Sequence, residues 1–291
     1  MNSRSALTWC LLFGLVASLL LALGLLMMKS RAASLPTARG AGTLRSIGRW
    51  LRDPIWLGGL GVQAAGYALY LIALSNAPVS LVAVMMQGGI ALFVVFAVIF
   101  LGERAAPREW AGIIGIVLAM VILAFSLQAG VTEAPASVRA LLVLTAIAAV
   151  AAVLPAMLER LRGNGVAAAI ASGIAFGMAS LYTKALTDSF MAAPGQAVLL
   201  RVFANPWTYA ASAANITGLV MLQNSFCAAR GIIAMPLSSA CSNIVPIVGG
   251  MIAFGESLPA DPLAAALRLG AFALTVAASA LLAIGQEDRT R

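Results

Sequence analysis

The side chains of this sequence that could bind a small ligand are amides and hydroxyls inside long apolar stretches. Ser212, Asn215 and Gln223 are spaced by three and eight residues, which places them on one face of a helix. Polar groups surrounded by hydrocarbon are costly unless they meet a partner or water. The stripe therefore indicates either the wall of a substrate cavity or a hydrogen-bonded seam between helices.

A second polar stretch lies between two prolines of one apolar run. Pro236 and Pro246 enclose four polar residues, Ser238, Ser239, Ser242 and Asn243. Each proline removes a backbone donor, so the freed carbonyl groups need water, hydroxyls or a ligand. We expect a broken or kinked helix that forms a binding site, although a kink stabilised by neighbouring helices would also fit.

An internal sequence repeat adds two glutamines to this candidate site. Pro54 opens one apolar run and Pro206 opens another, 152 residues later. Under the same offset, two glutamines pair with residues named above: Gln63 with Asn215, and Gln87 with Ser239. The predicted substrate-binding residues are Gln63, Gln87, Asn215, Gln223, Ser239 and Asn243.

The sequence offers no set of residues for catalysis or for a metal. It contains no histidine, and Cys10, Cys227 and Cys241 all lie within apolar runs. A zinc site lacks ligands and no nucleophile–base pair is visible, so we expect neither an enzyme nor a cofactor. The middle of each run also lacks Asp and Glu, which proton-coupled carriers usually place there.

Composition identifies the surroundings of the chain. Hydrophobic residues make up 62% of it and charged residues 10%, whereas a soluble domain has about 25% charged residues. We predict an all-α integral membrane protein with about nine transmembrane helices. The nine runs are Ala6–Met28, Pro54–Leu74, Pro78–Leu101, Trp110–Leu127, Val138–Leu158, Val166–Thr187, Pro206–Ala228, Gly231–Phe254 and Pro262–Ile284.

This internal similarity divides the chain into two repeats. Gly102-Glu103 ends a run in the first copy, and Gly255-Glu256 ends the corresponding run in the second. Residues 1–128 form the first repeat (spans 1–4), 129–165 hold a linker span, and 166–291 form the second repeat (spans 6–9). Five spans separate the two starts, so the copies should face opposite ways across the membrane, which suits alternating access. We expect both glutamates to be solvated carboxylates near the start of the following helix, or groups at the mouth of a pathway.

Basic residues indicate the orientation. Thirteen of them follow odd-numbered spans: Lys29, Arg31, Arg39, Arg45, Arg49, Arg52, Arg104, Arg108, Arg160, Arg162, Arg230, Arg289 and Arg291. Five lie on the other side: Arg4, Arg139, Lys184, Arg201 and Arg268. This asymmetry explains the net charge of +8 without nucleic acid, and it places the N-terminus outside and the C-terminus inside.

The basic loop 29–53, on the cytoplasmic side, ends in an amphipathic stretch. Ile47 and Trp50 gather on one face, and Arg45 and Arg49 on the other. A short helix in the headgroup layer with Trp50 as interfacial anchor would fit, as would a basic loop without defined structure.

Several motifs resemble those of the drug/metabolite transporter superfamily, most closely its EamA-type permeases and NIPA-like magnesium transporters. Ala77-Pro78-Val79-Ser80-Leu81-Val82 resembles the family stretch that opens a span, and Leu101-Gly102-Glu103-Arg104 resembles the one that closes it. In the second half, Gln223-Asn224-Ser225-Phe226 and Ala234-Met235-Pro236-Leu237 resemble NIPA-like patterns.

The resemblance implies a permease of a bacterial-type inner membrane that moves a small polar or amphipathic metabolite by alternating access. A NIPA-like Mg²⁺ transporter and a flippase for a lipid-linked head group are the alternatives. A non-transporting membrane subunit would need no polar cavity. The expected partners are the small-molecule or ion substrate and the lipid bilayer, with the chain a monomer or homodimer.

Overall fold

The structure, a computed structural model, describes residues 3–36, 43–76, 79–126, 137–157, 165–191, 203–255 and 261–290. Within these ranges the regular structure is helical and no strand occurs, which confirms the all-α prediction. The helices are α1 (Ser3–Ala32), α2 (Thr43–Trp50), α3 (Pro54–Asn76), α4 (Val79–Leu101), α5 (Pro107–Ser126), α6 (Val138–Met157), α7 (Val166–Met191), α9 (Pro206–Ala228), α10 (Gly231–Ala253) and α11 (Pro262–Thr290).

Each of the nine apolar runs coincides with one of these helices, and α2 is an additional short one. By length and composition, three stretches of the described residues could cross a membrane: Gly14–Ala32 in α1, Val166–Leu186 in α7 and Gly231–Ala253 in α10. The fold is therefore compatible with membrane insertion.

The outer face of α6 carries large apolar side chains that no other helix covers. They are 52–69% exposed: Leu142, Val143, Ile147, Val150, Val153, Leu154 and Met157. Monomeric soluble proteins rarely expose a contiguous apolar face of this kind. Contact with lipid tails would remove the free-energy cost of exposing these side chains to water.

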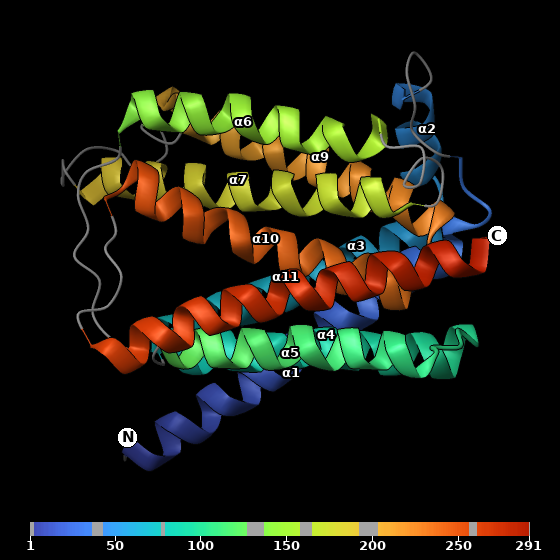
Figure 1. The fold of residues 1–291 in the computed structure, drawn as a ribbon, viewed down its shortest axis with the longest axis horizontal. Coiled ribbons are helices and arrows are strands. Elements are labelled where there is room, and N and C mark those ends of the chain that lie inside the picture. Colours follow the sequence, from blue (N-terminus) through green and yellow to red (C-terminus); the bar gives the residue numbers. More distant parts are fainter. Residues whose placement is uncertain are drawn as a thin grey trace.

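The helices form an elongated bundle, and the two chain ends lie at its opposite ends (Figure 1). In the first half, α1 packs on α3 and α4, and α4 packs on α5. In the second half, α7 packs on α9 and α10, and α10 packs on α11, while α6 lies against α7. The halves meet where α5 packs along α11 and where α10 contacts α4 and α5.

The two proline-led helices, α3 and α9, begin with the same kind of cap. Oδ1 of Asp53 accepts hydrogen bonds from the backbone N–H of Ile55 and Trp56, at 3.1 and 2.9 Å. Oδ1 of Asn205 accepts one from Trp207 N–H at 3.0 Å. A hydrogen bond from Arg31 and those backbone donors hold the pKa of Asp53 below its usual range. The stabilisation from this ionised cap is therefore present at neutral pH and is lost as the pH falls through the lowered pKa.

The helices α4 and α10 also end alike. Each is followed by a glycine in the left-handed conformation, Gly102 with φ of 65° and Gly255 with φ of 61°. Glu256 lies outside the described residues.

The helix α2 confirms the short helix expected in the basic loop, but its tryptophan is not an interfacial anchor. Trp50 is only 1% exposed, because it packs with Trp56 and Met28. Its indole N–H also donates to the Pro36 carbonyl at 2.9 Å. The apolar face of α2 is thus covered by protein instead of lipid.

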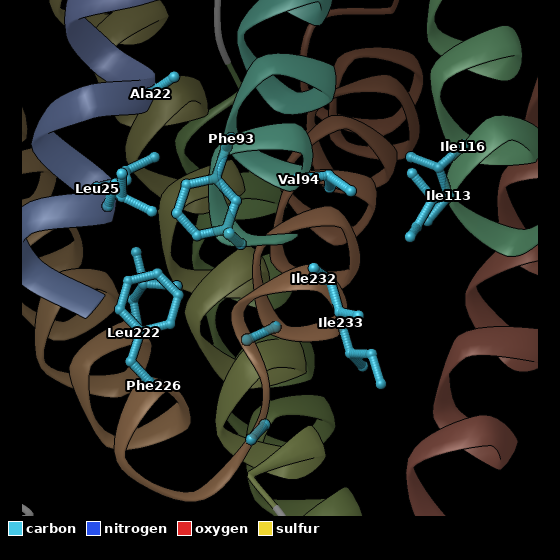
Figure 2. Close-up of a cluster of buried hydrophobic side chains, with 14 of the residues drawn as sticks. Ala22, Leu25, Phe93, Val94, Ile113, Ile116, Leu222, Phe226, Ile232 and Ile233 are labelled. Atoms are coloured by element: carbon cyan, nitrogen blue, oxygen red, sulfur yellow. The ribbon is translucent and has the colours of Figure 1, made fainter. Parts of the chain in front are cut away.

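A buried cluster joins the halves near the turn between α9 and α10. Figure 2 shows Phe93 of α4 and Phe226 of α9 near the start of α10, where Ile232 and Ile233 lie. The two phenyl rings are stacked with centroids 6.0 Å apart, and both isoleucines are fully buried. Because each half supplies one ring, this core exists only when the halves are assembled.

Close helix approaches depend on small residues. A Cβ atom added at Gly173 of α7 would lie 2.3 Å from the Ser238 carbonyl oxygen and 2.5 Å from Cys241 Cβ, both of α10. At Gly61 of α3, by contrast, an added Cβ would meet nothing within 4 Å. The α7–α10 contact therefore requires glycine, in the way that membrane helices use small residues to approach closely.

We expect Gly173→Ala to destabilise the protein, because the new methyl group forces α7 and α10 apart. Overpacking of this kind typically costs about 1–3 kcal/mol. The matched control, Gly61→Ala, should be neutral or slightly stabilising, because alanine favours the helix and has room. Thermal unfolding of both variants in one detergent measures the difference, and equal melting temperatures would contradict this account of the contact.

Candidate functional site

The helix α10 passes through both of its prolines without a break. It is one helix from Gly231 to Ala253, with Pro236 and Pro246 inside it, so the predicted break is absent, whereas the kink stays a prediction. Neighbouring α7 supports it through a buried hydrogen bond between the hydroxyls of Ser172 and Ser238, at 3.1 Å. Neighbouring helices that pack in this way stabilise a membrane helix at a proline.

The polar residues between the prolines are bonded to their own helix. The Asn243 side-chain amide donates to the Ser239 carbonyl at 2.7 Å, and the Ser242 hydroxyl donates to the same carbonyl at 2.9 Å. The side chains of Ser239 and Asn243 are half-buried. Two predicted site residues are thus brought together by one helical turn.

Gln223 occupies a seam between two helices. It is 0% exposed, and its Oε1 accepts a hydrogen bond from the indole N–H of Trp56 at 2.9 Å. Its Nε2 lies 4.0 Å from Cys227 Sγ, one turn further along α9. At this residue the polar stripe on α9 is therefore a hydrogen-bonded contact with α3.

The remaining predicted residues lie apart from that seam. Asn215 is exposed on α9 and donates to the Ala211 carbonyl at 2.9 Å. Gln63 is half-buried on α3 beside Gly24 of α1. The side chain of Gln87, in α4, lies outside the described residues. Among the described side chains, no hydrogen bond joins Asn215 or Gln63 to the other predicted residues.

An open groove of about 740 Å³ lies between α6, α7 and α9. Alanines form most of its wall, and its few polar side chains include Thr145, Tyr182 and Thr217. The hydroxyls of Thr145 and Tyr182 are 2.7 Å apart and bonded to each other. This apolar groove suits hydrocarbon, and none of the six predicted residues lines it.

One polar cluster of the described residues was not among the predicted site residues. It surrounds the turn between α9 and α10 and consists of Lys29, Glu103, Glu109 and Arg230, which we call the clasp. Glu103 follows α4, yet its Oε1 accepts from Gly231 N–H at 2.7 Å and its Oε2 from Ile232 N–H at 2.9 Å. The carboxylate therefore caps α10, 128 residues further along the chain.

Lys29 holds the other side of the same turn. Its ammonium group donates to the carbonyls of Phe226 and Ala229 at the end of α9, at 2.7 and 2.5 Å. It also lies 3.8 Å from the Glu103 carboxylate. A helix end carries partial negative charge and a helix start partial positive charge, so a lysine and a glutamate are complementary to this turn.

Arg230 completes the clasp from within the turn. Its guanidinium donates to the Glu109 carboxylate through both Nη1 and Nη2. Nη1 also donates to the Arg104 carbonyl at 2.5 Å. Glu109 is buried and accepts in addition from Ala106 N–H at 2.8 Å, which caps its own helix α5. Thus Lys29 of α1, Glu109 of α5 and Glu103, two residues after α4, all hold the α9–α10 turn.

The clasp corrects one expectation and supplies residues that sequence reasoning missed. Glu103 is not a solvated carboxylate at the following helix, because α10 provides two better-placed backbone donors. In the sequence, Lys29 and Arg230 served only as topology signals, and Glu109 carried no prediction. Their signal in the sequence was indirect: each lies at the end of an apolar run, where a helix terminus needs a partner.

Within the described residues, no group of three or more Asp, Glu, Cys or His could hold a metal ion. Comparisons with family models, with curated proteins and with solved structures found no match for this chain.

We expect Glu103→Gln to lower stability, because the amide keeps one acceptor and turns its N–H₂ toward a backbone donor. Hydrogen bonds to charged groups contribute about 1.5–3 kcal/mol. Asp261→Asn is the control: Asp261 caps only its own helix, accepting from Ala264 N–H at 2.9 Å, and Asn caps as well as Asp does. The melting temperature in detergent should fall by several degrees for Glu103→Gln alone. Equal melting temperatures for the two variants would show that the clasp does not stabilise the fold.

Proposed function

We propose that this chain is a membrane permease of the drug/metabolite transporter type. It would carry a small polar or amphipathic metabolite across a bacterial-type inner membrane by alternating access of two inverted repeats. The N-terminus would lie outside and the clasp inside.

The observation that carries this proposal is the matched but opposed arrangement of corresponding helices. The pairs α1–α3, α1–α4 and α4–α5 of the first half have counterparts in α7–α9, α7–α10 and α10–α11 of the second. The caps at Asp53 and Asn205 and the left-handed Gly102 and Gly255 follow the same correspondence. Secondary transporters with inverted repeats have this internal symmetry.

The contacts also support opposite directions for the two copies. Glu103 touches the first residues of α10, whereas Gly255 follows its last residue. A helix of 23 residues is about 34 Å long, so the two equivalent glycines, Gly102 and Gly255, lie at opposite ends of the bundle. Likewise Trp56, near the start of α3, contacts Gln223 near the end of α9, which puts the starts of α3 and α9 at opposite ends.

In this proposal the clasp closes one end of the transport pathway. It joins the halves by charged groups and backbone groups, which exchange partners with water when the end opens. The buried Phe93–Phe226 pair beneath it excludes water while the clasp is closed. Asn215, exposed on α9, and the half-buried Asn243 and Gln63 are then candidates for substrate contact.

The direct test is transport by the purified protein in liposomes. Counterflow of labelled amino acids, nucleosides, sugar phosphates and amines should reveal at least one substrate class, and ²⁸Mg²⁺ uptake forms a separate arm. Flux with Mg²⁺ alone would favour the magnesium alternative. No flux of any class by folded protein would favour a non-transporting subunit.

For the substrate found, we expect Asn215→Leu to lower uptake about tenfold without lowering membrane abundance, because it removes an amide from the pathway. A lost hydrogen bond to substrate of about 1.4 kcal/mol has this effect. Thr217→Val is the control, since Thr217 is also exposed on α9 and bonds only its own helix through Ala213. Unchanged uptake in Asn215→Leu would exclude Asn215 from the site.

A further inference from the structure

We infer that the outer face of α2 is a docking surface for the headgroups of anionic phospholipids, and that docking there stabilises the α3–α9 contact. The surface consists of Arg45 and Arg49 of α2 and of Arg52 in the turn that follows, which are all exposed. The inference concerns lipid and stands independently of which substrate, if any, the protein carries.

The charge of this surface is not neutralised by its own segment. Asp53 is the first acidic residue of the chain, and it is held by Arg31, whose Nε and Nη2 donate to it at 2.9 and 2.8 Å. Within the described residues, none of the ion pairs includes Arg45, Arg49 or Arg52. Arg45 and Arg49 are one helical turn apart on α2, and Arg52 lies in the turn after the helix, where its backbone N–H donates to the Arg49 carbonyl at 3.2 Å.

Neighbouring residues set the depth of this surface in a bilayer. Leu51 precedes Arg52 and is 49% exposed, and Ile55, three residues after Arg52, is 45% exposed. Exposed apolar side chains at the start of α3 mark where hydrocarbon begins. The three guanidinium groups precede that point along the chain, and in this inference they meet the lipid phosphates, which guanidinium groups bind through paired hydrogen bonds.

The opposite face of α2 connects this surface to the bundle. Trp50 lies against Trp56, with ring centroids 6.0 Å apart. Trp56 in turn donates its indole N–H to the buried Gln223 of α9. A lipid that holds α2 in place therefore also holds Trp56 in position for its bond to Gln223.

The experiment titrates phosphatidylglycerol into the full-length protein in a neutral detergent and records the melting temperature. Phosphatidylglycerol should raise it with a saturable midpoint, and phosphatidylcholine should not. In the triple variant Arg45→Gln/Arg49→Gln/Arg52→Gln, the midpoint should move to about a hundredfold higher lipid concentration, since three charges each contribute about a factor of five near an anionic surface. The charge-preserving triple Lys variant should keep most of the effect, and Arg139→Gln, exposed at the start of α6, should keep all of it.

A second variant separates docking from its consequence. Trp56→Phe removes the indole donor to Gln223 but leaves the arginines in place, so native mass spectrometry should still count bound phosphatidylglycerol while the thermal gain shrinks. Equal stabilisation of the wild type and the triple Gln variant would overturn the docking surface. Stabilisation by inorganic phosphate alone, or by an acidic peptide but not by the lipid, would overturn the lipid as its occupant.

Discussion

The structure depends on the need to satisfy the backbone groups at the turn between α9 and α10. The last carbonyls of α9 and the first N–H groups of α10 have no partners within their own helices. The turn is packed against the buried Phe93–Phe226 pair, so unpaired groups there would be costly. Lys29 and Glu103 supply the missing donor and acceptors, and both come from the first half of the chain.

This constraint links stability with the proposed transport cycle. The charged side chains that complete two helix ends of the second half also fasten it to the first, so one cluster serves folding and closure. The cluster is strong because its charged side chains bind backbone groups where the local dielectric constant is low. Water that enters the cluster raises the dielectric constant and weakens these interactions. Charged and backbone groups that close one end of the bundle can bind water instead when that end opens. Apolar side chains that close an end have no such alternative partner.

Much of the helical structure was predictable because a long apolar run favours a helix. Each of the nine runs contains a described helix, Pro54 and Pro206 stand at helix starts, and Gly102 and Gly255 follow helix ends. The tertiary partners were not predictable. Trp50 turns inward because Trp56 and Met28 offer a closer contact than lipid does, α10 stays continuous because α7 supports it, and Glu103 finds a helix 128 residues away. Each outcome depends on which helices become neighbours, and periodicity within one helix does not contain that information.

The central claim is that two similar halves cross one membrane in opposite directions. Cysteines introduced singly at Arg108 and Asp261, both exposed at helix starts, in a background lacking the native cysteines, test it most directly with a membrane-impermeant thiol reagent. In intact cells the account predicts labelling at Asp261→Cys, and at Arg108→Cys only after permeabilisation. Labelling of both positions from the same side would contradict the inverted arrangement.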